Sequence, residues 1–546
     1  MTSSGKPLES GNGSSSHSQE ISAAQGRWIL VATILGSSMA FIDSTVVNVA
    51  LPVLQQDLHA TAADVQWVIE AYALFLSALI LVGGSLGDRL GRKRMYTTGI
   101  ILFAIASAFC GFSVNITELI IWRSVQGVGA ALLVPGSLAI ISASFPASKR
   151  GPAVGTWSGL TAITSAIGPL IGGFLIQFSW RWIFFLNLPL AVITLILLFQ
   201  HVPESRDEGA EGPVDIRGAL LATVGLGALV FGLINAGADG FGHPEVLIPL
   251  AIGVLGLGGF VLSQMRERYP MMPLYLFRSR TFSGTNLLTL FLYGALGGAL
   301  YFLPFNLQKV HGYTPLEAGL ALLPFTIILS SLSRWAGGLI NRYGAKLPLM
   351  VGPTLAGFGF LLFARTGLNG NYWTQYFPAV VVLGLGMTVT VSPLTTAMLG
   401  AVSQDHAGIA SGINNAVART ASLVAIATLG IVVAQIFYGA LSQNLDALHL
   451  APAVSSAMEA QRDRLTGMQM PGGVSAATHD ALQLAVNDAF ISGFRAAMLV
   501  GALLAFASAV MAAVLVEGPF LPEKLEESLE QRLEQRHLRH PRNQYP

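Results

Sequence analysis

The chain has 546 residues, of which 53% are hydrophobic and 11% are charged, and its formal net charge is +1. Soluble domains carry roughly 25% charged residues. Here the charges are confined to short segments between apolar runs of about 20 residues, the length that a helix needs to cross a bilayer. This composition excludes a soluble globular protein and predicts an all-α integral membrane protein. The net charge by itself carries no information about nucleic acid, and no nucleic-acid partner is predicted. The single cysteine, Cys110, excludes an intrachain disulfide.

The apolar runs predict about fourteen membrane-spanning helices, and the even number places both termini on one side. Lys and Arg recur in alternate loops, whereas the opposing loops around 53–65, 114–118 and 238–244 carry none. Cytoplasmic loops are the ones that collect Lys and Arg, so we expect both termini to be cytoplasmic, in a plasma (cell inner) membrane. The predicted spans are residues 28–52, 66–87, 96–114, 118–140, 152–177, 181–200, 217–237, 245–265, 282–308, 316–340, 347–366, 374–398, 408–438 and 490–516.

The densest charge cluster, Gly84–Arg94 (GSLGDRLGRKR), joins spans two and three. Its glycines allow two helix ends to approach closely. We expect Asp88 to pair with Arg89, while Arg92 and the basic residues after it face water or lipid head groups. A cluster of this kind also sets the topology of the chain in the membrane.

Repeated patterns indicate two related halves. Gly337–Lys346 resembles the charged hairpin, and Gly384-Leu385-Gly386 repeats Gly127-Val128-Gly129. Such repeats are typical of secondary transporters, whose substrate site lies near the midplane where the halves meet. The predicted domains are a disordered cytoplasmic N-terminus (1–27), a six-helix bundle (28–200), two inserted helices (201–281), a second six-helix bundle (282–516) with an outer loop (440–489), and a cytoplasmic tail (517–546) containing a short amphipathic helix.

Asp43 falls well inside span one, where an isolated carboxylate is costly and is a functional hypothesis by default. In one interpretation it takes up and releases a proton during a transport cycle. In the alternative, hydrogen bonds to Ser44, Thr45 or Asn48 hold it in a packing role.

Two further charged residues lie within the predicted spans of the first half. Glu70, near the outer end of span two, either binds a proton or a cation or reaches the membrane interface. Arg123 in span four needs a partner, for which Asp43 and Glu70 are the candidates. In the second half the intramembrane candidates are Arg334 and Arg419.

Four motifs carry a family resemblance: the hairpin, Phe41–Pro52 (FIDSTVVNVALP) in span one, Ile167–Gly173 (IGPLIGG) in span five, and Arg123 with Gln126, Gly127 and Gly129 in span four. Through them, residues 28–516 resemble the fourteen-span drug:proton antiporters of the major facilitator superfamily. The resemblance implies that Arg123 competes for a carboxylate during proton transfer; a purely structural ion pair is the alternative. It also implies a latch between the halves, formed by Gly84, Asp88, Arg89, Gly91 and Arg92.

The resemblance further implies that span five is an antiporter helix. Gly168, Gly172 and Gly173 allow close helix contact, and Pro169 bends the helix and thereby controls a leak pathway or a hinge. Thr164 stands where the family pattern usually has a glycine.

We therefore predict a proton-coupled efflux antiporter that exports hydrophobic or cationic drugs or toxic compounds by alternating access. Its partners are small molecules, protons and membrane lipid, and a periplasmic adaptor protein stays an open question. No cofactor, metal or enzyme activity is predicted. The alternatives are an exporter of one dedicated metabolite or lipid, and a non-transporting membrane sensor or scaffold. Five aromatic residues either line an apolar pocket or serve in packing: Phe41, Trp157, Phe291, Tyr293 and Tyr301.

Overall fold

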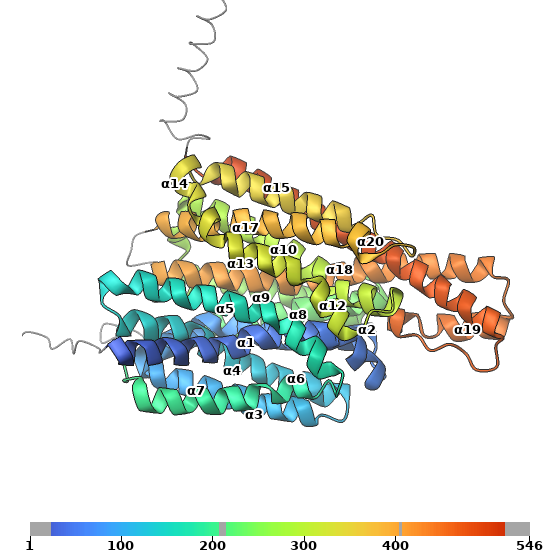
Figure 1. Cartoon of the computed structure of the whole chain (residues 1–546), viewed down its shortest axis with the longest axis horizontal. Helices are drawn as coiled ribbons and strands as arrows, with labels where there is room; N and C mark the ends of the chain where they lie inside the picture. Colours follow the sequence, from blue (N-terminus) through green and yellow to red (C-terminus); the bar gives the residue numbers. More distant parts are fainter. Residues whose placement is uncertain (1–22, 207–213, 403–406, 519–546) are drawn as a thin grey trace, which may run out of the picture.

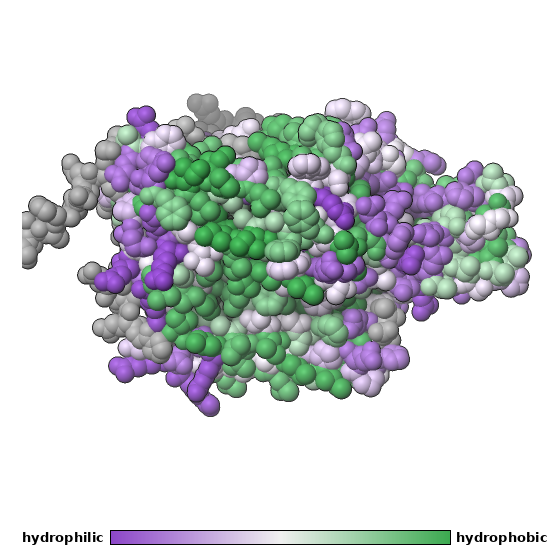
Figure 2. Space-filling model, turned by 90° about the horizontal axis from the view of Figure 1, so that it is seen from below, coloured by the Kyte–Doolittle hydropathy of each residue, from purple (hydrophilic) through white to green (hydrophobic). Residues whose placement is uncertain are grey.

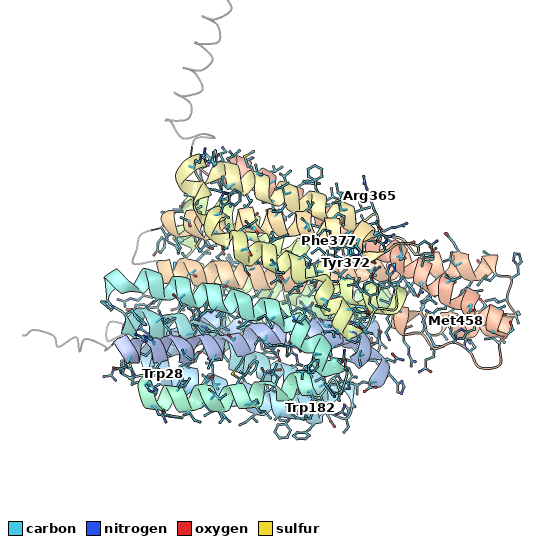
Figure 3. The ribbon with its side chains drawn as sticks, viewed as in Figure 1. Trp28, Trp182, Arg365, Tyr372, Phe377 and Met458 are labelled. Atoms are coloured by element: carbon cyan, nitrogen blue, oxygen red, sulfur yellow. The ribbon has the colours of Figure 1, made fainter. Side chains whose placement is uncertain are left out.

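The computed structural model describes residues 23–206, 214–402 and 407–518, and within these residues the secondary structure is helical, with no strand. The long helices lie side by side along one axis (Figure 1). Trp28 marks one end of this bundle and Met458 the other (Figure 3). We call the first the terminal end and the second the loop end. The predicted tail helix lies outside the described residues.

The helix bounds agree with the predicted spans to within a few residues in most cases. The long helices are α1 (Ala23–Asp57), α2 (Ala62–Leu90), α3 (Arg92–Phe112), α4 (Ile116–Ser144), α5 (Ala147–Ile176), α7 (Asn187–His201), α8 (Ile216–Asp239), α9 (Pro244–Arg266), α10 (Arg280–Tyr301), α13 (Leu323–Gly337), α15 (Lys346–Phe363), α17 (Phe377–Gly400), α18 (Ala407–Ala447) and α20 (Ala476–Leu515). Short helices are α6 (Trp182–Phe185), η1 (Leu274–Arg278), α11 (Leu303–Phe305), η2 (Asn306–Val310), α12 (Pro315–Ala321), α14 (Leu339–Tyr343), α16 (Tyr372–Gln375), α19 (Pro452–Glu459) and η4 (Arg462–Gly467).

Thirteen helical segments of the described chain are long and apolar enough to cross a membrane. The 30-residue α5 occupies the position of the remaining predicted span, so the expectation of about fourteen spanning helices is confirmed. Apolar side chains cover the middle of the bundle and polar side chains gather toward its ends (Figure 2). This distribution is the one expected of a protein whose solvent at mid-height is hydrocarbon.

The glycine repeat has a packing role that is the same in both halves. Gly127 of α4 lies against α2 and Gly129 against α3, while Gly384 of α17 lies against α13 and Gly386 against α15. A Cβ atom at Gly129 would come within 2.7 Å of a backbone atom of α3, so the close approach requires glycine. At this glycine pair, the helices of α1–α7 and of α10–α20 therefore pack in the same way.

The inserted helices α8 and α9 pack on each other, and α8 also contacts both halves through α2 and α18. Leu74, Val230 and Leu423 form part of a buried apolar cluster at this junction. In the most apolar window of α9 only 11% of the residues are buried, compared with 44% in that of α8. The second inserted helix is thus the more peripheral of the two.

The connection near residues 440–489 differs from the predicted loop. Helix α18 continues to Ala447 and α20 begins at Ala476, so that residues 448–475 remain as the connection. The two extensions pack together, with Asn444 Nδ2 donating to the carbonyl of Ala485 at 3.1 Å and with Leu445 and Leu482 buried. Polar residues interrupt these helices, and hydropathy therefore ends the two spans too early.

Candidate functional site

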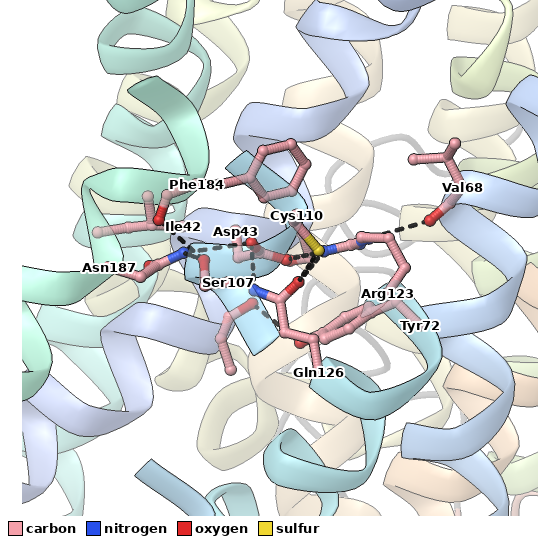
Figure 4. Close-up of polar contacts among 12 residues, drawn as sticks. Ile42, Asp43, Val68, Tyr72, Ser107, Cys110, Arg123, Gln126, Phe184 and Asn187 are labelled. Carbon is pink, nitrogen blue, oxygen red and sulfur yellow. Dashed lines mark hydrogen bonds and ion pairs between the residues drawn. The ribbon is translucent and has the colours of Figure 1, made fainter. Parts of the chain in front are cut away.

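Asp43 stands at the centre of a buried polar network inside the first half (Figure 4). Arg123 Nη1 donates to Asp43 Oδ2 at 2.5 Å. Gln126 Nε2 donates to Asp43 Oδ1 at 2.9 Å, and its own Oε1 accepts from Arg123 Nη1 at 2.8 Å. Arg123 and Gln126 face the same carboxylate because they are three residues apart on α4.

Asn187, from the start of α7, completes this network and was missed by the sequence analysis. Its Nδ2 donates to Asp43 Oδ1 at 3.3 Å and to Ser107 Oγ of α3 at 3.0 Å. Ser107 in turn donates to the carbonyl of Phe184. The network therefore draws on α1, α3, α4, α6 and α7. An asparagine and a serine within apolar runs are the signal that could have identified it.

The Arg123 side chain is fully buried. Its Nε donates to the carbonyl of Val68 on α2 at 3.0 Å, and its guanidinium lies 4.3 Å from the ring centre of Tyr72. A cation over an aromatic face is attracted by the ring quadrupole. Arg123 therefore links the Asp43 carboxylate to α2, the helix that faces the second half.

The structure decides which groups hold Asp43 and Arg123. The alternative in which Ser44, Thr45 or Asn48 bonds to Asp43 is not seen, since these side chains donate instead to backbone carbonyls of α1. Helix geometry is the reason, because a hydroxyl or amide on a helix reaches the carbonyl one turn earlier. Of the two candidate partners, Arg123 pairs with Asp43.

Glu70, also on α2, is fully buried, and neither of its carboxyl oxygens has a hydrogen-bond partner among the described residues. It does not reach the interface. Tyr301 of α10 lies within electrostatic range of this carboxyl, which places Glu70 toward the second half. A charged carboxylate in such surroundings is costly, so the site suits a proton or a cation.

On the second half, Arg419 of α18 lies within electrostatic range of Tyr72. Tyr72 thus contacts Arg123 of its own half and also feels the charge of Arg419 in the second half. The Arg419 Nε is buried without a hydrogen-bond partner in the described part of the chain. The side chain of Arg334, on α13, lies outside the described residues.

The motif of span five forms a crossing point between the halves. Gly168 and Gly172 of α5 pack against α1. A Cβ atom at Gly173 would come within 2.6 Å of the Cα atom of Leu316 in α12, and Gly319 of α12 faces the backbone of Pro169. Small residues on both helices are what permit this approach.

The departure from the family pattern in span five has a structural consequence. The hydroxyl of Thr164 on α5 accepts a hydrogen bond from Ser38 Oγ of α1 at 3.0 Å. Threonine therefore adds a hydrogen bond between α1 and α5, whereas a glycine at this position would only allow the two helices to pack closely.

In the charged hairpin, Arg92 pairs with Asp88 at 2.8 Å, so the expectation that Arg92 faces only water or lipid is wrong. The two residues are four apart around the helix break at Gly91, whose φ of +112° favours glycine. Glu204, which the sequence analysis missed, caps α3 by accepting from the backbone N–H groups of Lys93 and Arg94. Gly84 lies near Pro135 of α4.

Of the five aromatic candidates, Tyr301 lines a cavity between the halves. Phe41 and Trp157 pack edge to face with ring centres 6.5 Å apart, and Trp157 Nε1 donates to Ser37 Oγ. This pair therefore serves in packing between α1 and α5. Phe291 and Tyr293 are half-buried on α10.

His311 lies just beyond a span at the loop end, next to Tyr376 at the start of another. The His311 ring packs edge to face on Tyr376, with ring centres 5.4 Å apart. Burial lowers the pKa of His311 below its usual value. The Tyr376 hydroxyl donates to Asn306 Oδ1.

The family model of the Major Facilitator Superfamily matches residues 33–426 of the chain. The chain belongs to this superfamily. Among solved structures, it resembles the bacterial homologue of the human lysosomal transporter Spinster in its inward-facing, unoccupied conformation, with a TM-score of 0.62, 16% identity, and coverage of 91% of this chain and 100% of the other. It also resembles the xylose transporter XylE from E. coli in its inward open conformation, with a TM-score of 0.55 and 14% identity. That match covers 92% of this chain and 99% of the other. At these identities the likeness shows the fold alone.

Among curated proteins, the tetracenomycin C resistance and export protein of Streptomyces glaucescens is 34% identical over 494 residues, which cover 88% of this chain and 90% of the relative. The multidrug resistance protein Stp of Mycobacterium tuberculosis is 33% identical, covering 90% of each. The methylenomycin A resistance protein of Bacillus subtilis is 33% identical, covering 76% and 89%. This superfamily member is thus a multi-pass membrane transporter with drug-resistance and export homologues, and the resemblance to drug exporters is confirmed.

Proposed function

We propose that this transporter is a proton-coupled antiporter that exports hydrophobic, cationic or amphipathic compounds across the plasma membrane by alternating access. The carrying observation is the ion pair of Asp43 and Arg123, both fully buried in one half of the bundle and bonded through Gln126 and Asn187. A titratable group inside a membrane is a functional hypothesis by default. The names of the drug-resistance relatives support the export part of the proposal.

We infer that the terminal end lies in the cytoplasm. The hairpin of Arg89, Arg92, Lys93 and Arg94 lies at this end, together with the start of α1. Positive charge near span ends is retained on the cytoplasmic side. The connection 448–475 then lies outside the cell, and export runs from the terminal end to the loop end.

Coupling follows from the electrostatics of the pair. While Asp43 is ionised, it compensates Arg123. A proton on Asp43 leaves the guanidinium buried and uncompensated. Removing one partner of a buried ion pair costs about 3–5 kcal/mol, and protonation has a similar effect. Protonation is therefore favourable only in a state where Arg123 gains another partner or water. This requirement ties the proton on Asp43 to the conformation of α4 and α2.

Glu70 supplies a second acidic position for the same cycle. It is the other fully buried carboxyl within the described first half, and it lies on the helix whose Val68 carbonyl accepts from Arg123. A cation or a proton at Glu70 removes the cost of a bare carboxylate. Glu70 thus serves as the group that senses substrate or proton from the side of the second half.

The moving parts are the two six-helix bundles, 28–200 and 282–516, with 201–281 as the inserted pair. In the proposed cycle they separate at one end while they close at the other. The crossing of α5 and α12 closes the loop end, and the hairpin at Asp88 latches the terminal end in the opposite state. Glycines at the crossing leave little room for intervening side chains, which keeps the closed end tight.

The test is proton flux in inverted membrane vesicles, reported by a pH-sensitive dye, on addition of ethidium or tetracenomycin C. We compare the unaltered protein with Asp43→Asn and with the control Asp57→Asn. Asp57 is an exposed carboxylate on the same helix that accepts from Trp180 Nε1, and asparagine retains an oxygen for that bond. We expect substrate-dependent proton release from the unaltered protein and the control, reduced at least tenfold in Asp43→Asn.

Full flux in Asp43→Asn would move the coupling group away from Asp43, and Glu70→Gln would then be measured. A lack of flux in the unaltered protein with every compound of the panel would refute proton coupling.

A second candidate is export of a single dedicated compound. It is favoured by two relatives whose names specify one antibiotic each, tetracenomycin C and methylenomycin A. Cells that express the transporter would then resist one compound of a chemically mixed panel, whereas the broad exporter protects against several unrelated ones. Protection that survives collapse of the proton gradient would contradict both candidates.

A further inference from the structure

Two cavities lie at the loop end, on either side of η4 (Arg462–Gly467). The first, of about 50 Å³, is mostly apolar and lies between the halves; its lining includes Gln66, Tyr301, Phe305, Tyr438, Leu465 and Phe490. The second, of about 320 Å³, is polar, and its lining includes Gln56, His59, Lys309, Arg464, Thr466 and Gln483. Gln55 borders both cavities. An apolar chamber and a polar vestibule are therefore separated by one short segment of the connection.

Within this segment, Leu465 points to the apolar chamber, whereas its neighbours Arg464 and Thr466 line the polar vestibule. The Leu465 side chain is 8% exposed. Its backbone has φ 49° and ψ −120°, a conformation that glycine adopts readily and a residue with a Cβ atom rarely does. Backbone strain of this kind persists where surrounding contacts hold it. The burial of the leucine side chain is such a contact.

The segment touches both halves of the bundle. Helix η4 contacts α1 and α2 of the first half and α18 and α20 of the second. Gln55 Nε2, near the end of α1, donates to the carbonyl of Arg464 at 2.9 Å. A Cβ atom at Gly467 would come within 2.9 Å of the Gln55 side chain. Two more bonds join the halves beside it, from Gln308 to the carbonyl of Val49 and from Lys309 to Gln56 Oε1.

We propose that η4 is the gate at the loop end of the export route, with Leu465 as its plug and the bond from Gln55 to the Arg464 carbonyl as its latch. Two halves that part at this end cannot both keep their contacts with η4, so the segment must leave one of them. Its withdrawal joins the apolar chamber to the polar vestibule, and a compound then passes from an apolar to a hydrated surrounding. This inference rests on the alternating-access part of the proposed function.

The first experiment ties the gate shut. In a Cys110→Ser background, which serves as the reference for all rates, we introduce Gln55→Cys with Gly467→Cys and bridge the two thiols with a short bis-methanethiosulfonate. We expect ethidium export to fall at least tenfold and to return on reduction with dithiothreitol. The matched control is Gln461→Cys with Gln469→Cys. These residues are bonded to each other inside the connection, so their bridge leaves η4 free of α1, and we expect at least half of the export rate.

The second experiment removes the plug and needs no transport. In the same background, Tyr301→Cys places a thiol in the apolar chamber, and a membrane-impermeant maleimide is added to intact cells. We expect Leu465→Gly, which relieves the backbone conformation, to raise the labelling rate about tenfold. The control Leu450→Gly alters another leucine of the connection, and we expect no change from it.

The outcomes separate the gate from the proposed function. The gate would be overturned if the export rate were the same with and without the bridge between Gln55→Cys and Gly467→Cys. It would also be overturned if Leu465→Gly left the labelling rate of Tyr301→Cys unchanged. A transporter without proton flux whose chamber nevertheless opens in Leu465→Gly would retain the gate and refute the antiport. Export that falls equally in the bridged control would assign the effect to stiffening of the connection and would also overturn the gate.

Discussion

Removing either member of the Asp43–Arg123 pair is expected to destabilise the fold more than removing both. Asp43 is 1% exposed and Arg123 is 0% exposed, so a single neutral substitution leaves one uncompensated charge in the interior. That cost is about 3–5 kcal/mol. In Asp43→Asn/Arg123→Gln no buried charge remains, and we expect a loss of about 2 kcal/mol from imperfect hydrogen bonds. The interaction energy of the cycle, which is the loss in the double variant minus the losses in both single variants, is then about 4–8 kcal/mol in magnitude.

The measurement is equilibrium unfolding of the purified protein in mixed dodecylmaltoside and SDS micelles, followed by tryptophan fluorescence. The two single variants, the double variant and the control Asp57→Asn are compared with the unaltered protein. Single losses that add up in the double variant, with an interaction energy below about 0.5 kcal/mol, would refute the reasoning. In that case the pair would not be held in a low-dielectric interior.

Three further outcomes are expected. Burial lowers the pKa of His311, so the unfolded chain binds a proton there more readily than the folded chain; this contribution to stability is present above about pH 6.5 and is lost as the pH falls below it. His311→Gln should therefore reduce the dependence of the unfolding temperature on pH between pH 5 and 8. An unchanged pH dependence would assign it to other groups. Gly319→Leu should lower the free energy of unfolding by about 1–3 kcal/mol and weaken closure at the loop end, because the new side chain meets the backbone of Pro169. The control is Gly439→Leu, since Gly439 has open space around it. Equal losses of unfolding free energy in the two variants would contradict the crossing. Asp88→Asn removes a half-exposed i,i+4 pair and should change stability by less than about 0.5 kcal/mol while lowering export, so that normal export would argue against a latch.

Much of the polar site in the first half of the bundle could be predicted from the sequence. Asp43 and Arg123 were identified because charged residues inside apolar runs are rare and costly, and the structure pairs them. Asn187 and Ser107 were missed because neutral polar residues are common in membrane helices. Their role depends on a meeting of α3, α6 and α7 with α1 that no spacing along the chain encodes.

The limits of the connection at the loop end illustrate a second kind of failure. Hydropathy assigned 440–489 to a loop, whereas the helices α18 and α20 extend past the apolar spans. Helix formation there depends on the packing of one extension against the other, through contacts such as Leu445 and Leu482. The mean hydropathy of one segment carries no information about which of its side chains a distant helix will bury.

The sequence by itself determined the membrane class, the number of spanning helices, the internal repeat and the family. These properties depend on apolar length and on short motifs, which are local. Tertiary structure alone decided that Asp43 pairs with Arg123, that Glu70 is buried without a described hydrogen-bond partner, and that Leu465 lies between the halves. Each of these depends on which faces of distant helices meet, because the free energy of a buried charge or side chain is set by the atoms around it.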